Sequence, residues 1–207
     1  MSSNFMATCS SLRWKRHSDE KIEGRGAKVE DATAYAPPST FDFPMTVIRL
    51  DEQTIAIGEL DLLGVELLAQ IPVSAEPADN VEAHDRLFPS PTGGRDRTLD
   101  RDWENYVEPG LRELFQSSLQ IIEEDLAEFP PDQPADHYTL TLPIRHLEAW
   151  IHGLNQARLA IAARYGFTEE DMEGRMPISG DTRAFGLFQV HVYGFLQECF
   201  LRELGDS

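Results

Sequence analysis

The chain has 207 residues, of which 41% are hydrophobic and 26% charged, a composition typical of a globular protein with a sizeable core. Its formal net charge is −18 at pH 7. Residues 1–44 hold six basic and six acidic residues, whereas residues 45–207 hold 12 arginines, no lysine and 30 acids. So negative a surface repels phosphate backbones and anionic lipid, and we therefore expect no binding to nucleic acid or membranes.

Cysteine usage and the lack of long apolar runs indicate the compartment. Cys9 and Cys199 are too few and too far apart for a disulfide framework or a clustered zinc site. No run approaches the ~18 apolar residues of a membrane span, and the N-terminus lacks the apolar region of a secretory signal. We expect free thiols and a cytoplasmic protein, with no metal and no cofactor.

Residues 1–44 show neither the period of a strand nor that of a helix, and they are rich in Ser, Lys, Glu and Gly. A segment of this composition buries too little apolar surface to offset its ordering entropy. We therefore predict a disordered segment over 1–44 and a single domain over 45–207. The upstream residues are either a start codon assigned too early or a real flexible tail, and the sequence leaves both open.

The first half of the predicted domain begins with two short β-branched runs, 46–50 and 54–58, that read as a hairpin. Leucines at helical spacing predict a helix over about 59–70, which Pro72 ends. Residues 72–98 are rich in turn residues and are expected to form a loop. A short helix marked by Trp103 and Tyr106 follows. A longer helix is predicted from Pro109 to Pro130.

The second half is predicted to be mainly helical. Residues 137–143 alternate as a strand, and Thr141 and Pro143 are then expected to start a helix that Gly166 closes. Thr168 and Asp171 resemble a capping box, and the last helix runs from Asp181 to about 204. The fold class is therefore mainly α with a small β element (α+β): about four to five helices, an N-terminal β-hairpin, and a third strand at 137–142.

No common catalytic motif is present, and we predict no catalytic residues. Glu148 and His152 share one helix face, but a metal would need further ligands from other elements. Solvated surface residues are the preferred interpretation of these side chains. Cys199 lies on an apolar helix face, where a buried and unreactive thiol is expected. The histidines and acids that could complete a metal site are His137, His146, His191 and Glu198.

Arg158 is the most informative polar residue, because it falls inside an apolar helical stripe between Leu154 and Ile161. A charged side chain there must reach solvent or meet an acid. We expect an ion pair between Arg158 and Glu198. This interpretation predicts a polar cluster between the two C-terminal helices, made of Asn155, Arg158, Gln197 and Glu198. The cluster either fixes the register of the two helices or binds a ligand.

Four segments carry a family resemblance: RLFP (86–89), DWENYVEPGLREL (102–114), EAWIHGLNQARLAIAARYG (148–166) and FLQECFLREL (195–204). Their most specific element combines Trp150, Leu154-Asn155 and Arg158-Leu159 with Leu196-Gln197. These segments resemble the motifs of an uncharacterised bacterial domain-of-unknown-function family, best represented in actinobacteria and often encoded beside the Clp protease adaptor ClpS. The resemblance covers about 45–204 and implies no activity. Ser90-Pro91-Thr92 replaces the acidic-aromatic residues that the resemblance leads us to expect after Pro89.

Three functions remain open from the sequence. The first is a soluble, non-catalytic regulatory or protein-interaction domain linked to protein turnover, with an unidentified protein partner. The second is a small-molecule-binding or hydrolytic enzyme that uses the polar cluster around Arg158. The third is a structural subunit of a homo-oligomer. A pocket lined by polar groups would favour the second, whereas an apolar patch outside the core would favour the first or the third.

Overall fold

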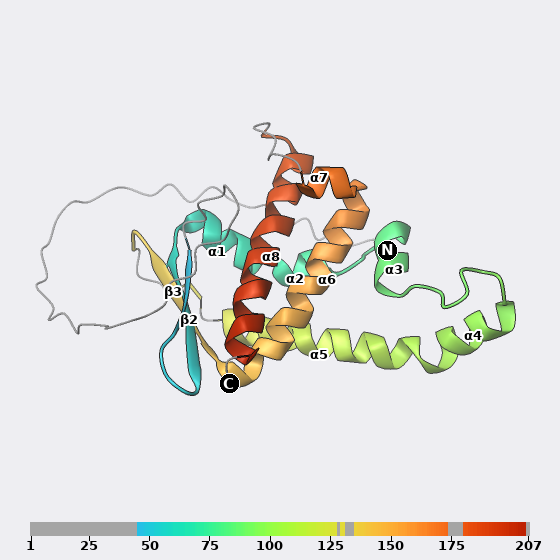
Figure 1. Cartoon of the computed structure of the whole chain (residues 1–207), viewed down its shortest axis with the longest axis horizontal. Coiled ribbons are helices and arrows are strands. Elements are labelled where there is room, and N and C mark those ends of the chain that lie inside the picture. Colours follow the sequence, from blue (N-terminus) through green and yellow to red (C-terminus); the bar gives the residue numbers. More distant parts are fainter. Residues whose placement is uncertain (1–44, 128, 131–134, 174–179, 206–207) are drawn as a thin grey trace, which may run out of the picture. The chain divides into compact units, whose positions relative to one another are not determined.

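The computed structural model describes residues 45–127, 129–130, 135–173 and 180–205 (Figure 1). The segment expected to be disordered, 1–44, lies outside these residues. The predicted fold class is confirmed. No helix in the described ranges has both the length and the apolar character needed to cross a membrane. The elements are β1 (Thr46–Arg49), β2 (Thr54–Leu60), α1 (Leu62–Ala69), α2 (Ile71–Ala75), α3 (Val81–Leu87), α4 (Arg97–Tyr106), α5 (Glu108–Leu126), β3 (Tyr138–Pro143), the 3₁₀ turn η1 (Ile144–His146), α6 (Leu147–Tyr165), α7 (Glu169–Glu173) and α8 (Thr182–Gly205).

The three strands form an antiparallel sheet in the order β1–β2–β3, so the predicted hairpin and third strand are both present. Ile57 on the central strand pairs with Val47 on one side and Leu140 on the other. Along β3, Tyr138, Leu140 and Leu142 are buried while Thr139 and Thr141 between them are exposed. One face of the sheet therefore covers the core, as the alternation of the sequence requires.

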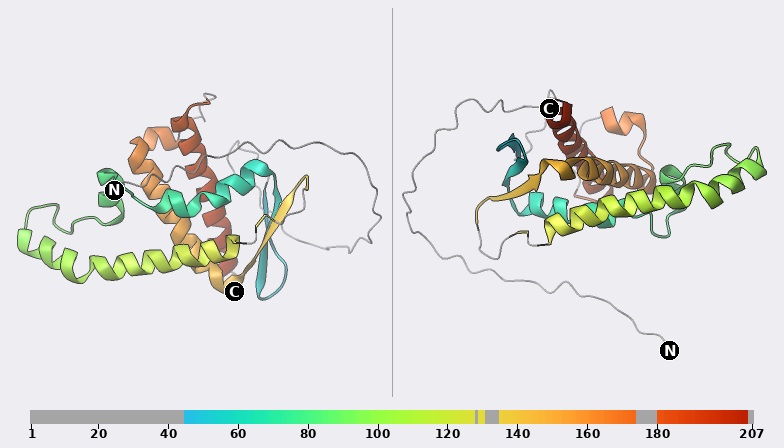
Figure 2. Two further views of the ribbon diagram at one scale, coloured as in Figure 1. Left: turned by 180° about the vertical axis from the view of Figure 1, so that it is seen from behind. Right: turned by 90° about the horizontal axis from the view of Figure 1, so that it is seen from below.

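α6 is the central helix of the domain and packs against α2, α3, α5 and α8. Figures 1 and 2 show α6 and α8 lying side by side. Trp150 of α6 meets Phe200 of α8 edge to face, with ring centroids 6.1 Å apart, and both rings are fully buried. Burial of such large apolar surface is the main force that holds the two helices together.

Two glycines allow helices to approach closely. A Cβ atom on Gly153 of α6 would overlap with Ile122 of α5, and a Cβ on Gly186 of α8 would lie 2.6 Å from the Tyr165 ring of α6. Ile122 is itself fully buried, so it has little space into which to move. The separations of α6 from α5 and from α8 therefore depend on these positions remaining glycine.

A buried hydrogen-bond network ties α8 to α1 and to the residue that follows α1. The Tyr193 hydroxyl donates to the Leu67 carbonyl at 2.8 Å, and Gln189 Nε2 donates to Gln70 Oε1 at 2.8 Å. Burial raises the pKa of Tyr193, which therefore stays protonated and acts as a donor at neutral pH. These bonds satisfy polar groups that would otherwise be costly to bury.

The predicted loop over 72–98 is wrong in part, because α2 and α3 lie within it. Pro72 does not end a helix but occupies the first turn of α2, where its missing amide proton costs nothing. Asn80 caps α3 through its side chain. Helices of five and seven residues are too short to show a clear apolar period, which explains why the pattern was missed.

The other predicted helix boundaries give mixed results. Thr141 and Pro143 belong to β3 rather than to the start of α6, so that prediction is wrong. Gly166 closes α6 in the left-handed conformation with φ of 60°, as expected. The Thr168–Asp171 capping box is confirmed by reciprocal hydrogen bonds of 2.9 and 3.3 Å. The Ala184 amide donates to the Asp181 carboxylate at 2.7 Å, which confirms the predicted cap of α8.

Substituting Gly153 by alanine tests the close approach of α5 and α6. Alanine favours the helix by ~1 kcal/mol, but overlap with a buried side chain costs ~1–3 kcal/mol. The difference predicts that Gly153→Ala lowers the free energy of unfolding by up to about 2 kcal/mol in urea denaturation followed by circular dichroism. The matched control is Gly110→Ala on α5, where a Cβ meets nothing within 4 Å and should stabilise by about 0.5–1 kcal/mol. Equal stability of the two variants would contradict the packing argument.

Candidate functional site

Asp85 of α3 and Phe88, the residue that follows α3, line a pocket together with Glu108 at the start of α5. α3 begins where the Asn80 side chain accepts a hydrogen bond from the Ala83 amide at 2.7 Å. Ala83 and Phe88 then pack with Ala160 of α6 in a second buried cluster. This packing fixes α3 on α6, and with it the positions of Asp85 and Phe88.

The loop between α3 and α4 is organised around one buried carboxylate. Asp100 accepts hydrogen bonds from the Ser90 hydroxyl at 2.6 Å, the Thr92 hydroxyl at 2.7 Å and the amides of Thr92 and Gly94 at 3.1 and 3.0 Å. The hydrogen bonds from Ser90 and Thr92 hold the pKa of Asp100 below its usual value. Gly93 and Gly94 have φ of 62° and 83°, a conformation that other residues rarely adopt.

α4 carries the aromatic wall of the site. Its first turn is capped by Asp96, whose carboxylate accepts hydrogen bonds from the Thr98 and Leu99 amides at 2.9 and 3.2 Å. Val107 is at once the last cap of α4 and the first of α5, so the two helices follow each other directly. Trp103, one turn before this junction, therefore faces the region between α3 and α5.

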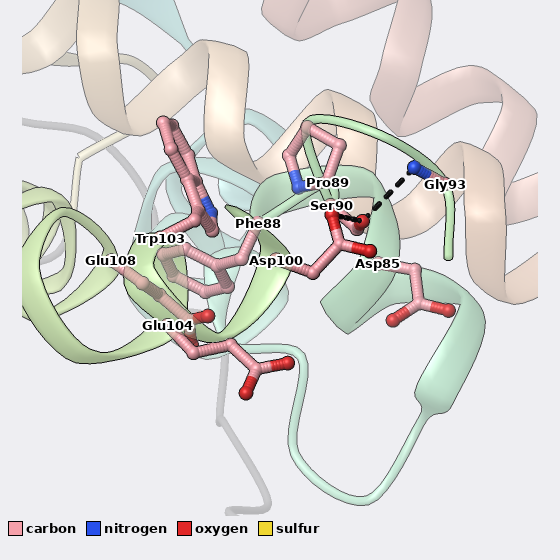
Figure 3. Close-up of a pocket in the computed structure, with 9 residues that line it drawn as sticks. All are labelled: Asp85, Phe88, Pro89, Ser90, Gly93, Asp100, Trp103, Glu104 and Glu108. Carbon is pink, nitrogen blue, oxygen red and sulfur yellow. Dashed lines mark hydrogen bonds between the residues drawn. The ribbon is translucent and has the colours of Figure 1, made fainter. Parts of the chain in front are cut away.

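α3, α4, α5 and the loop before α4 together surround a pocket of about 420 Å³ (Figure 3). A volume of this size is within the range of small-molecule sites. Figure 3 shows the hydrogen bonds that join Ser90 to Asp100 and to Gly93 at one side of the pocket. Two aromatic residues and four acids contribute most of its chemistry: Phe88, Trp103, Asp85, Asp100, Glu104 and Glu108.

One acid of the pocket is neutralised by a neighbouring cation. Glu108 accepts hydrogen bonds from Arg112 Nε at 2.9 Å and from Arg112 Nη2 at 2.5 Å. The same guanidinium lies over the Phe88 ring, 4.1 Å from its centroid. One face of Phe88 is thus already occupied by a cation, which is the kind of contact that aromatic faces favour.

Two other acids of the pocket have no such compensation. Glu104 makes no hydrogen bond or ion pair within the described part of the chain, and Asp85 has only a 3.5 Å contact with His84 Nδ1. Asp100 is held by neutral donors, so its negative charge is kept. Four carboxylates against one arginine leave the pocket strongly negative.

Trp103 adds a hydrogen-bond donor without a partner. Its indole Nε1 is buried, and no acceptor among the described residues reaches it. A buried donor left unpaired costs about 1–3 kcal/mol. An acceptor on a bound molecule would recover that energy.

The predicted polar cluster between α6 and α8 forms in part. Arg158 Nη1 donates to Gln197 Oε1 at 2.5 Å, so the structure brings these two residues together. Asn155 and Glu198 are exposed. No ion pair joins Arg158 to Glu198, although both residues are described, and the expected pairing is therefore wrong. The helix face that meets α6 carries Gly194 and Gln197, whereas Glu198 is turned about 100° away from Gln197.

Arg158 lies against the backbone of α8. A Cβ atom on Gly194 would be 3.3 Å from Arg158 Cζ, so the guanidinium rests on this glycine. Burial lowers the pKa of Arg158, and the negative charge of Glu198 opposes that shift. Burial, reinforced by the charge of Arg158, also lowers the pKa of His191, which is therefore neutral at pH 7. The contacts of Arg158 with Gly194 and Gln197 give a physical reason why the cluster would fix the register of α6 and α8. Its role in binding a ligand stays a prediction.

Of the other residues considered for metal binding, His146 has a structural partner. Its Nδ1 lies 2.9 Å from the carboxylate of Asp125, which also accepts a hydrogen bond from the Trp150 indole at 2.8 Å. Glu148 is exposed. In the described ranges no three His, Cys, Asp or Glu residues are placed to hold a metal ion. Burial raises the pKa of the Cys199 thiol to about 11, in agreement with the predicted buried thiol.

The pocket residues were not selected from the sequence, although a signal for them was present. Phe88 and Pro89 belong to the segment RLFP, and Trp103, Glu104 and Glu108 belong to DWENYVEPGLREL. Both segments carry the family resemblance. Ser90 and Thr92, which follow RLFP, are the residues whose hydroxyls organise the loop.

Fold and pocket together define a mainly helical domain with a small antiparallel sheet and an acidic, aromatic pocket at α3, α4 and α5. The chain belongs to the family described as Domain of unknown function (DUF2017), which matches residues 49–204. The resemblance to a domain-of-unknown-function family is thereby confirmed. No curated protein and no solved structure matches the chain.

A double-mutant cycle tests the contact between Arg158 and Gln197. Removing a partly buried, charge-assisted hydrogen bond costs ~1–2 kcal/mol, so Arg158→Ala should lower the free energy of unfolding by that amount. Gln197→Ala should destabilise less, and the double variant should lose less than the sum. Glu198→Ala is the control and should stay within ~0.5 kcal/mol of wild type. A loss with Glu198→Ala as large as with Arg158→Ala would show that the ion pair forms after all.

The pH dependence of stability tests the role of Asp100. Because its pKa is lower in the folded protein than the ordinary value of 3.8, its stabilising effect is present above that value. The effect is lost as pH falls through the lowered pKa. We expect Asp100→Asn to melt below wild type at pH 7 and this difference to shrink below about pH 4. The control is Asp102→Asn, an exposed position on the same helix, which should melt like wild type at pH 7. If Asp102→Asn lowers the melting temperature as much as Asp100→Asn does, the role of Asp100 is contradicted.

Proposed function

We propose that the domain is a non-catalytic protein-interaction module whose pocket receives a cationic side chain of a partner protein. The observation that carries this proposal is the pocket of about 420 Å³, in which the half-buried Trp103 indole lies with the uncompensated carboxylates of Asp85 and Glu104. Aromatic walls accept the aliphatic part of an arginine or lysine side chain. The carboxylates attract its charge.

Electrostatics favour a cation over a neutral or anionic ligand. The pocket carries more carboxylates than cations, and the region 45–207 as a whole holds 30 acids against 12 arginines. An anion would have to approach against this field. A cation gains ~0.5–2 kcal/mol from an aromatic face and up to ~1 kcal/mol from each exposed carboxylate, so a single side chain should bind with a Kd of about 1 mM or weaker.

The unpaired donor of Trp103 supports a peptide rather than a free metal ion or a simple amine. A peptide that places a cation beside the Trp103 indole also offers backbone carbonyls, which are good acceptors for the buried indole Nε1. Recovering that hydrogen bond would favour the bound state. The chemistry of the pocket therefore supports a protein partner.

The polar cluster around Arg158 supports the alternative, a small-molecule enzyme, less well. Asn155 and Glu198 are exposed, and the Arg158 guanidinium is bound to Gln197 and rests on Gly194. In this arrangement the Arg158 side chain holds α6 and α8 together. A regulatory role in protein turnover and a cytoplasmic location are part of the proposal, because the family resemblance and the free thiol of Cys199 support them.

Binding of a model side chain tests the proposal directly. N-acetylarginine amide should cause a saturable shift of the Trp103 indole N–H resonance, identified with the Trp103→Phe variant. N-acetylcitrulline amide, which has the same shape without the charge, should cause none. Glu104→Gln should weaken binding about two- to fivefold, because it removes one exposed charge.

The control is Glu113→Gln, an exposed position on α5 outside the pocket that changes the net charge equally. It should bind like wild type. Equal shifts with the arginine and citrulline compounds, or unchanged binding in Glu104→Gln, would show that the pocket does not select a cation.

A further inference from the structure

Four large apolar side chains are exposed on α4, on α5 and at their junction. Tyr106 is 81% exposed, Leu99 55%, Leu114 49% and Val107 45%. Such exposure is common for one apolar residue but not for four within 16 positions of one sequence. We name Leu99, Tyr106, Val107 and Leu114 the apolar stripe.

The spacing of the apolar stripe places Leu99 above Tyr106 and Val107 above Leu114, in two rows about 100° apart around the helices, which together make a broad apolar side. Leu99 and Tyr106 are seven residues apart, as are Val107 and Leu114, and seven residues make about two turns. The stripe therefore runs for about 22 Å at 1.5 Å per residue. Figure 2 shows α4 and α5 following one another along this path.

The stripe adjoins the pocket. Trp103 lies one turn after Leu99 and one turn before Val107, and it also lines the pocket. The free carboxylate of Glu104 is the next residue along the chain. An apolar surface and a negative cavity are thus presented side by side on the same helix.

We propose that the apolar stripe is the docking surface for an amphipathic helix of another protein, which directs an arginine or lysine from its apolar face into the pocket. This inference rests on the proposed function and names the kind of partner. The 22 Å length corresponds to about 15 residues of a partner helix, which is an ordinary helix-in-groove contact.

The structure favours a helix over an extended peptide. The backbone groups of α4 and α5 are used within their own helices, so a strand would find no edge to pair with there. Apolar residues two turns apart match the spacing of apolar residues on an amphipathic helix.

Charge selects a basic partner over a second copy of this chain. The pocket beside the stripe is negative, and two copies would each bring the large acidic excess of residues 45–207 to the contact. A helix that carries arginine or lysine complements this charge, whereas a second copy repels it.

Selection from a displayed library of random 16-residue peptides against the full chain tests the inference. Enriched peptides should share apolar residues spaced three, four and seven apart with one arginine or lysine at a fixed position among them. The labelled enriched peptide should bind the double variant Tyr106→Ser/Leu114→Ser at least tenfold more weakly than wild type. The matched control Leu62→Ser/Val73→Ser changes two equally exposed apolar residues on α1 and α2 and should bind like wild type.

N-acetylarginine amide separates this inference from the proposed function. It should bind wild type and both double variants equally, because the apolar stripe lies outside the pocket. If it binds but the stripe variant keeps full affinity for the peptide, or if the enriched peptides lack the pattern, the docking surface is wrong and the cation pocket stands. If it fails to bind wild type, both proposals fall. A dimer in sedimentation that the stripe variant dissociates would assign the stripe to a second copy and overturn the inference.

Discussion

The pocket depends on α3 and α5, which both pack against α6. Gly153 of α6 leaves space for Ile122 of α5, while Ala160, two turns further along, receives α3. α6 therefore holds both α3 and α5, from which Asp85 and Glu108 reach the pocket.

The acids of the pocket divide into two kinds by their partners. Asp100 is surrounded by neutral hydroxyl and amide donors, and Glu108 is paired with Arg112. These two carboxylates build the site. Asp85 and Glu104 have no comparable partner among the described residues. Neutral donors stabilise the Asp100 carboxylate without cancelling its charge. The loop between α3 and α4 is therefore held in place while the pocket keeps the negative charge of Asp100. The hydroxyls of Ser90 and Thr92 both donate to Asp100, and the loop is therefore well organised.

The sequence predicted the features that depend on local patterns. The hairpin, β3 and the long helices follow from alternation and helical spacing, and the caps at Gly166 and Asp181 follow from local chemistry. The short helices α2 and α3 lack a full apolar period and were assigned to a loop. The ion pair expected between Arg158 and Glu198 does not form. Gln197 and Glu198 are adjacent on α8 and point about 100° apart, and it is Gln197 that meets Arg158 of α6. The pocket was missed because it joins residues from 85 to 108 across a loop, which periodicity alone does not bring together.

The uneven burial of the helices has a consequence for hydrogen exchange. In α4 Asp100 alone is buried among the described residues, whereas ten residues of α6 are buried. Opening α4 therefore exposes little apolar surface and costs less than unfolding the domain, so its amides exchange sooner than those of α6. α4 nevertheless supplies Trp103 and Glu104 to the pocket. A molecule bound there would hold α4 in place, and part of its binding energy would appear as slower exchange along that helix rather than as affinity.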